Sequence, residues 1–269
     1  AAETRFPRLE TLIMESTYGG QNDNYPSRRE AEDLLYKTIK ETIARGGKVL
    51  MPVLGTGRAQ EIMVIIEKGV RNGILEKIPV YIQGIVWDIT AIHTAYPDFF
   101  NSTVRKLIFH KDQNPFLNEI FKQVGSRKEM DQVLEGGPCV ILATSGMMVG
   151  GASVEYFKEM ADNPKNTIVF SSYLGPGSLG RKISEGDKDF NIDGKEIKMK
   201  MEVAAIRGFS GHSPRDKLLN FIRHLEPKPK KIILVHGESS KCLELASTLH
   251  KTFRIETNAP KNLEALRIK

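Results

Sequence analysis

The sequence predicts an α/β protein with a mainly parallel, doubly wound sheet. Three observations carry this prediction: short apolar strand-like runs, helix-like segments between them, and turn residues separating the two. Strands that alternate with helices form βαβ units, whose strands run parallel and whose helices cover both sheet faces. With 269 residues, 40% of them apolar, the chain is long enough for one large soluble domain or two smaller ones.

The strand-like runs are short, partly β-branched and bounded by turn residues. They lie at residues 48–54, 78–82, 106–109, 139–143 and 167–171. Helices are expected at residues 27–44, 59–71 and 153–161, with two more near residues 115–134. Asp193-Gly194 predicts a turn, so the run at 197–205 is expected to be the return arm of a hairpin.

The closing part of the chain reads as two strand-and-helix pairs. Ser213 and Pro214 predict an N-cap and a first-turn proline, and Pro227 ends that helix. Its apolar positions follow helical spacing at Leu218, Phe221, Ile222 and Leu225. A strand is expected at 231–235, and Ser239 is expected to cap a second helix. The buried stripe of that helix would be Cys242, Leu245, Ala246 and Leu249.

Two histidines and one acid stand where apolar runs end. They are His212 in Phe209-Ser210-Gly211-His212, His236 in Leu234-Val235-His236-Gly237-Glu238, and Glu15 at the end of the run that begins at Leu12. A loop at the carboxyl end of a strand is where a rigid sheet presents side chains for chemistry. The two imidazoles alone are too few for zinc, which takes three or four protein ligands.

Further motifs lie between these stretches, in a fixed order. They are Gly57-Arg58-Ala59-Gln60-Glu61, Asn114-Pro115-Phe116, Thr144-Ser145-Gly146-Met147 and Gly177-Ser178-Leu179-Gly180-Arg181-Lys182. With Met14-Glu15-Ser16-Thr17-Tyr18-Gly19 and the two histidine stretches as motifs A, B and C, the chain resembles the β-CASP branch of the metallo-β-lactamase superfamily. The likeness runs almost end to end and is greatest to archaeal homologues of the nuclease subunit of the cleavage and polyadenylation specificity factor.

The resemblance implies three segments. Residues 1–20 would end an N-terminal metallo-β-lactamase portion, residues 21–206 would form the β-CASP domain, and residues 207–269 would close the αββα lactamase domain. The family's His-x-His-x-Asp-His motif lies upstream of motif A, whereas the 14 residues before Glu15 contain no His or Asp. We therefore expect a C-terminal fragment that begins as if cut, at Ala1-Ala2-Glu3-Thr4.

The resemblance also assigns roles in the chemistry. The intact enzyme would hold two zinc ions and hydrolyse RNA phosphodiesters. His236 matches a zinc ligand, and His212 matches the motif B histidine near the scissile phosphate, where an imidazolium stabilises charge or donates a proton. Glu15 would accept the ring N–H of His212 and keep that ring protonated. Without the resemblance, structural roles for all three residues are favoured, and Glu238 is equally a second-sphere acceptor or an early-turn acid.

Contacts to RNA are expected at loops that follow strands. The residues are Arg58, Ser145, Gly146, Arg181 and Lys182. A salt bridge is an almost equal alternative for Arg58, and a plain turn for the loop before Arg181. Gly175-Pro176-Gly177-Ser178-Leu179-Gly180 fits the dinucleotide-binding pattern, but Pro176 removes a backbone donor and no strand-end acid follows about 20 residues later, so we discount that reading.

Composition narrows the functional classes. The apolar runs are too short to cross a membrane, and Cys139 and Cys242 read as buried free thiols in a reducing, cytoplasmic compartment. A net charge of +6 is compatible with a polyanionic partner such as single-stranded RNA. The chosen function is part of a zinc ribonuclease acting in RNA 3′-end processing or transcription termination, the fragment alone being inactive. The alternatives are an inactive RNA-binding scaffold and a nucleotide-dependent enzyme.

The resemblance implies partners as well. Archaeal relatives suggest a homodimer formed near the C-terminus, so residues 258–269 are a candidate contact. RNA polymerase or processing factors are possible further partners, and no membrane partner is expected.

Overall fold

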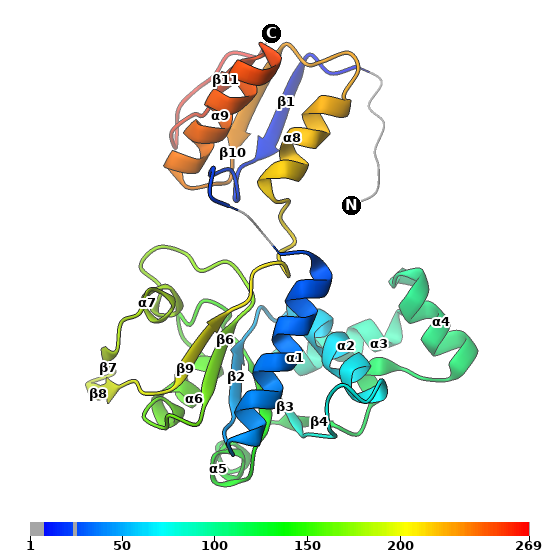
Figure 1. The fold of residues 1–269 in the computed structure, drawn as a ribbon, viewed down its shortest axis with the longest axis vertical. Coiled ribbons are helices and arrows are strands. Elements are labelled where there is room, and N and C mark those ends of the chain that lie inside the picture. The colour runs from blue at the N-terminus through cyan, green and yellow to red at the C-terminus, as the bar shows by residue number, and fades with distance from the viewer. Residues whose placement is uncertain (1–7, 24–25, 269) are drawn as a thin grey trace. The chain divides into compact units, whose positions relative to one another are not determined.

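The computed structural model describes residues 8–23 and 26–268, which form two compact units (Figure 1). Unit 1 joins the described residues up to 23 with residues 210–268, and unit 2 comprises residues 26–209. The division of the chain at residues 20 and 206 into lactamase and β-CASP segments stays a prediction. The expected start at Ala1–Thr4 lies outside the described residues.

Unit 2 is built on a six-stranded parallel sheet in the order β4-β3-β5-β2-β6-β9. Its strands are β2 (Val49–Pro52), β3 (Val80–Gln83), β4 (Phe121–Val124), β5 (Val140–Ala143), β6 (Thr167–Phe170) and β9 (Glu202–Ala205). β2 and β5, at the centre, are buried at every position, as expected of strands covered on both faces. The predicted fold class, α/β with a mainly parallel sheet, is confirmed.

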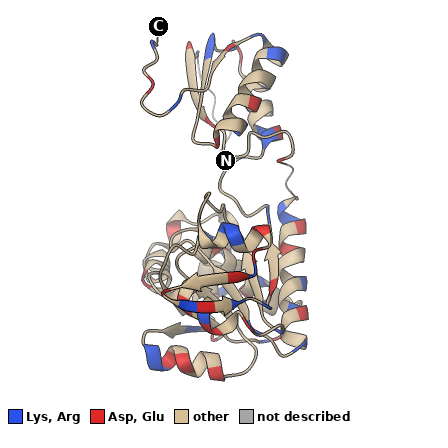
Figure 2. Ribbon diagram, turned by 90° about the vertical axis from the view of Figure 1, so that its left-hand side faces the viewer, with Lys and Arg blue, Asp and Glu red and all other residues tan. Residues whose placement is uncertain are grey.

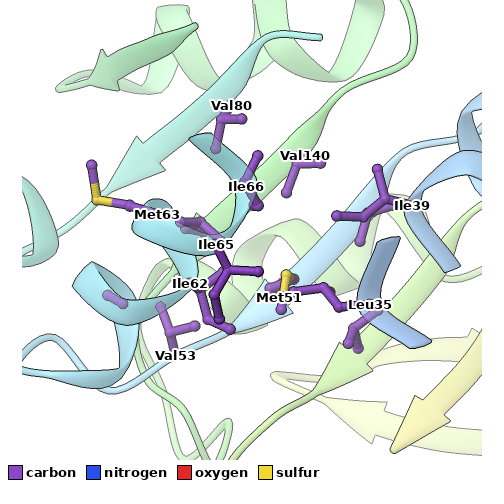
Figure 3. Close-up of a cluster of buried hydrophobic side chains, with 14 of the residues drawn as sticks. Leu35, Ile39, Met51, Val53, Ile62, Met63, Ile65, Ile66, Val80 and Val140 are labelled. Carbon is purple, nitrogen blue, oxygen red and sulfur yellow. The ribbon is translucent and has the colours of Figure 1, made fainter. Parts of the chain in front are cut away.

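Alternate residues of these strands feed two separate apolar clusters, one on each face. Val49 and Met51 of β2 belong to the first cluster, whereas Leu50 between them belongs to the second. The first cluster also takes Leu35 from α1 and Ile66 from α2, as Figure 3 shows. Because successive side chains of a strand point to opposite faces, this division shows that helices pack on both sides of the sheet.

The helices of unit 2 follow or precede the strands as crossovers. They are α1 (Arg28–Ala44), α2 (Arg58–Arg71), α3 (Val86–Ala95), α4 (Ser102–Lys111), α5 (Arg127–Glu135), α6 (Ala152–Met160) and α7 (Leu179–Glu185), with 3₁₀ turns η1 (Pro97–Phe99) and η2 (Pro115–Leu117). The start of α1 is fixed by a capping box, in which the Ser27 side chain accepts from the Glu30 backbone N–H and the Glu30 carboxylate accepts from that of Ser27.

Unit 1 has a three-stranded parallel sheet, with β10 (Lys231–Val235) between β1 (Thr11–Glu15) and β11 (Glu256–Asn258). Two helices, α8 (Arg215–His224) and α9 (Ser239–Phe253), bury their apolar stripes against β10. The stripe of α9 is Cys242, Leu245, Ala246 and Leu249, as its spacing predicted. Glu15 and Val235 are paired partners, so the ends of β1 and β10 lie side by side.

Two predicted elements are wrong. Residues 106–109, expected as a strand, lie inside α4, which Asn101 caps by accepting the Val104 backbone N–H. Of the two helices expected near residues 115–134, only α5 forms. The first part of that segment is the short turn η2, followed by the strand β4. In both segments a few apolar residues fit helix and strand spacing equally well, and capping decides the outcome.

The hairpin prediction is half right. β7 (Asp189–Ile192) and β8 (Lys195–Lys198) form an antiparallel pair around Asp193-Gly194, but the return arm ends at Lys198. The backbone N–H groups of Lys200 and Met201 both donate to the Ala161 carbonyl, which redirects the chain. β9 then joins the main sheet parallel to β6.

Two predicted caps are also wrong. The N-cap of α8 is Pro214 rather than Ser213, and that of α9 is Glu238 rather than Ser239. The Ser213 backbone N–H donates instead to a Glu15 carboxylate oxygen at 2.9 Å, so the segment before α8 is held by the site described below.

Both cysteines are buried and free, as predicted. Burial raises the pKa of the Cys139 thiol to about 12. Among the described residues, no helix combines the length and the apolar character that a membrane crossing requires.

Candidate active site

Unit 1 brings Glu15, His212 and His236 together at one edge of its sheet. Glu15 ends β1, His236 follows the last residue of β10, and His212 lies in the segment before α8. Parallel neighbouring strands end at the same edge, so the two strand ends place their side chains close together. One ligand atom from each of the three residues lies within 4.8 Å of the other two.

Glu15 and His212 are in contact. The Nδ1 atom of His212 lies 2.6 Å from Glu15 Oε2, and the other carboxylate oxygen accepts the Ser213 backbone N–H. The backbone N–H of His212 donates to the Ser210 hydroxyl at 3.1 Å, and the edge of Tyr18 meets the ring at 6.2 Å between centroids. The carboxylate compensates the charge that His212 carries when it holds a proton, and these contacts fix the position of the ring.

His236 occupies an uncommon backbone conformation. Its φ of 54° lies in the left-handed region, where residues with a side chain persist only if their surroundings hold them. The Thr17 hydroxyl donates to the His236 carbonyl at 3.0 Å and supplies that restraint. The next residue must be small, because a Cβ on Gly237 would lie 2.6 Å from the Ser16 carbonyl oxygen. The His236 side chain is thereby turned out to solvent at the sheet edge.

The donor set suits zinc in its chemistry. Imidazole nitrogen and carboxylate oxygen are zinc ligands in proteins, and two of the former and one of the latter meet here. Glu15 and His212 are engaged with each other, whereas the exposed His236 ring makes no such pair with a carboxylate among the described residues.

Loops of unit 2 carry the residues predicted to contact RNA. Arg58 follows β2, Ser145 and Gly146 follow β5, and Arg181 and Lys182 lie in α7 after β6. These loops touch one another at the carboxyl edge of the sheet. The Gly180 backbone N–H donates to the Met147 carbonyl, and a Cβ on Gly146 would lie 3.0 Å from the Leu54 backbone nitrogen. The five residues thus lie in or directly after three adjoining loops.

Three of these five residues are buried or held by contacts within unit 2. The Arg58 side chain is only 10% exposed and pairs with Glu61, which also pairs with Arg28, so the salt-bridge alternative gains support. The Ser145 hydroxyl donates to the Gly150 carbonyl and accepts the Val149 N–H, which closes its own loop. Gly146 is buried. The RNA roles of these residues stay predictions.

Arg181 and Lys182 are more accessible. The Arg181 side chain is 39% exposed and pairs with Glu185 at 2.5 Å, and Lys182 is exposed. The Ser178 hydroxyl donates to the Gly175 carbonyl and accepts the Arg181 N–H, so the loop before α7 is closed by its own side chain. In Figure 2, Lys and Arg are interspersed with Asp and Glu over both units, so in this view the net charge is not gathered in one place.

The structure adds one residue that the sequence did not single out. Thr17 is 6% exposed, and its hydroxyl lies between the two histidines, 3.0 Å from His236 Nδ1 and 3.3 Å from His212 Nδ1. Its place in motif A, two residues after Glu15, was visible in the sequence. Only the pairing of β1 with β10 brings it to His236, and that pairing joins residues more than 200 positions apart.

Comparison with known proteins identifies the family of the chain. Residues 59–183 match the family model of the Beta-Casp domain, and residues 196–260 match that of the Zn-dependent metallo-hydrolase RNA specificity domain. Proteins named transcription termination factor FttA are similar over the whole chain, with 50% identity in Thermococcus kodakarensis, 51% in Methanocaldococcus jannaschii and 48% in Methanothermobacter thermautotrophicus.

The chain spans 42% of the length of the first of these relatives and 43% of the other two. Its motifs, its parallel α/β fold and these matches agree with the resemblance drawn from the sequence. The chain belongs to the β-CASP branch of the metallo-β-lactamase superfamily.

Proposed function

We propose that this chain is part of a zinc-dependent ribonuclease that hydrolyses RNA phosphodiester bonds in 3′-end processing or transcription termination. The observation that carries the proposal is the Glu15–His212 pair beside the exposed His236 at the ends of two paired strands. The match to the Zn-dependent metallo-hydrolase RNA specificity domain and the termination factors among the relatives support it. Because the chain spans well under half of those relatives, the activity is proposed for a longer protein.

His212 acts at the phosphate. Hydrolysis of a phosphodiester builds negative charge on the non-bridging oxygens and on the leaving oxygen. A protonated imidazole stabilises the first or donates a proton to the second. Glu15, with Oε2 at 2.6 Å from His212 Nδ1, compensates the ring's charge and orients it.

His236 holds metal. Zinc, when bound, would polarise the phosphate and supply an activated water at neutral pH. The ring is accessible, and Gly237 and Thr17 fix its backbone, so it is oriented before any ligand arrives. Glu15 and His212, the two other residues of the cluster, are engaged with each other, so the further ligands that zinc requires are proposed to come from the longer protein.

Partners are proposed from the same comparisons. Single-stranded RNA would be held through phosphates by Arg181 and Lys182, with Arg58, Ser145 and Gly146 shaping the adjoining loops. A homodimer through residues 258–269 is supported by the exposed side chains of Leu263 and Ile268, Lys269 lying outside the described residues. RNA polymerase or processing factors remain proposed partners of the longer protein.

A hybrid protein tests the function. This chain would replace the matching region of the Thermococcus kodakarensis relative, and cleavage of labelled RNA would be measured with the unmodified relative in parallel. The proposal expects cleavage that stops on chelation and returns with Zn²⁺. A hybrid that binds zinc and RNA without cleaving would show the inactive scaffold instead. Nucleotide protection of the chain against thermal unfolding would indicate the nucleotide-dependent alternative.

A further inference from the structure

Thr17 lies at the centre of the site and makes three polar contacts through one oxygen. Its hydroxyl donates to the His236 carbonyl at 3.0 Å, and the same oxygen lies 3.0 Å from His236 Nδ1 and 3.3 Å from His212 Nδ1. Thr17 is 6% exposed, so water does not compete freely for these contacts. A buried hydroxyl that bridges two imidazoles constrains where their protons lie.

Only one placement of the protons makes all three contacts of the Thr17 oxygen hydrogen bonds. A threonine hydroxyl has one proton to donate and two lone pairs to accept. If the proton goes to the His236 carbonyl, both ring contacts are filled by Nδ1–H groups donating to the oxygen. If the hydroxyl donated to His236 Nδ1 instead, the contact to the carbonyl would be lost, and with it the restraint on the left-handed backbone of His236.

The His212 ring supports the same placement. Its Nδ1 atom faces two groups that can accept a proton, Glu15 Oε2 at 2.6 Å and the Thr17 hydroxyl at 3.3 Å. Both contacts favour a proton on Nδ1. Both rings turn their Nδ1 edge toward Thr17, and their centroids lie 5.0 Å apart with the ring planes 32° from parallel.

We infer that Thr17 is a positioning residue that keeps a proton on Nδ1 of both histidines and leaves Nε2 of His236 as the atom offered to metal. The inference rests on the proposed zinc-binding role of His236. A histidine ligand needs its second nitrogen held by a hydrogen-bond acceptor, which fixes both tautomer and ring direction. Here the acceptor is a hydroxyl that comes from the neighbouring strand end.

The test reads the tautomer directly. Two-dimensional ¹H–¹⁵N spectra of this chain at pH 8 distinguish protonated from unprotonated ring nitrogens, and His236→Gln and His212→Gln assign the signals. The wild-type chain should show His236 protonated at Nδ1. Thr17→Val, which replaces the hydroxyl by a methyl group, should give a mixture of tautomers, and Thr17→Ser, which keeps a hydroxyl, should restore the wild-type state. Thr257→Val is the matched control, because the Thr257 hydroxyl donates to the Ala246 carbonyl in the same unit and contacts neither ring.

Zinc gives a second readout. The chain is titrated with Zn²⁺ alone, and binding is followed through the His236 signals. The zinc affinity should fall roughly 10- to 100-fold in Thr17→Val, the usual effect of losing the hydrogen-bond partner of a ligand. It should stay unchanged in Thr257→Val. A wild-type His236 protonated at Nε2, or a tautomer unchanged in Thr17→Val, would overturn the inference. A hybrid without nuclease activity would refute the proposed function while leaving the tautomer result standing.

Discussion

Unit 2 buries two apolar clusters on the two faces of a six-stranded sheet, whereas the three-stranded sheet of unit 1 buries one smaller cluster among its described residues. The Glu15–His212–His236 cluster lies in the unit with the smaller core. Its side chains are held by polar contacts between strand ends, to Thr17, Ser210 and the Ser213 backbone. The polar contacts that hold the site therefore lie in unit 1. Substitutions in the site should lower activity, whereas substitutions in an apolar core should lower the stability of the unit that contains it.

The largest effect is expected from the site. In the hybrid protein, His212→Ala should lower the RNA cleavage rate roughly 10² to 10⁴-fold, the range for losing a positioned acid. The cleavage rate should fall less in Glu15→Gln, because the amide oxygen still accepts a hydrogen bond but no longer compensates the charge of the His212 ring. Single-turnover cleavage assays measure both. If Glu15→Gln is as damaging as His212→Ala, the carboxylate has a direct role that this account does not give it.

A matched pair of leucines tests the separation of the two cores. Leu35 of α1 and Leu249 of α9 are both fully buried, one in each unit. Each change to Ala should cost about 2–5 kcal/mol of stability in its own unit. Amide hydrogen exchange should be measured separately for the two units. Protection should be lost only in α1 and its neighbours for Leu35→Ala, and only in α9 and β10 for Leu249→Ala. Equal loss in both units would mean that they unfold together.

Alkaline pH should weaken unit 2. Burial raises the pKa of Cys139 from its ordinary 9.0 to about 12, and burial, with nearby acids, raises the pKa of Tyr36 to about 12. A thiol that is harder to ionise when folded stabilises the fold less as pH rises above its unfolded pKa. Between pH 9 and about 10.5, the thiol alone should remove about 1.5–2 kcal/mol.

Cys139→Ala isolates this contribution. Denaturant unfolding of the wild-type chain and the variant across that pH range should show a shallower decline for the variant by about the stated amount. Identical pH slopes would mean that Cys139 ionises as readily in the folded chain as in the unfolded one.

The smallest effect is expected from the RNA-contact loops. Changing Arg181 and Lys182 to Ala should weaken single-stranded RNA binding and lower its salt slope by about 0.7 per lost phosphate contact. Removing the exposed Lys37 and Lys40 from α1 takes away the same charge and should change the slope less. Arg58→Ala should mainly lower thermal stability, because it breaks the pair with Glu61. Equal slopes in all variants would mean non-specific attraction only.

Much of the fold was predictable because its patterns are local. The stripe of α9 and the strands β2, β5 and β10 follow from spacing and turn residues in the sequence. The errors arise where a distant partner decides. The strand expected at 106–109 forms a helix once Asn101 caps it, and the segment at Ser213, before α8, is held by a hydrogen bond to Glu15, 198 residues away.

The site was predictable in part for the same reason. Glu15, His212 and His236 stand in recognisable motifs, and the structure brings them together. Thr17 was not singled out, because a buried threonine in a strand-end turn is usual, and its role appears only when β10 brings His236 beside it. The pair of Arg58 with Glu61 follows from i,i+3 spacing on α2, whereas the pair of the same Glu61 with Arg28 depends on how α1 and α2 pack.

The central claim is the division of labour between the two histidines. Zinc content and cleavage rate, measured on the same samples of the hybrid protein, test it most directly. His236→Ala should lose both zinc and activity, since it removes a ligand, whereas His212→Ala should lose activity and keep its zinc. The present chain alone, with His236 as its one proposed ligand, should not retain stoichiometric zinc after dialysis. A His212→Ala protein that loses zinc in step with activity would contradict the account and make His212 a metal ligand.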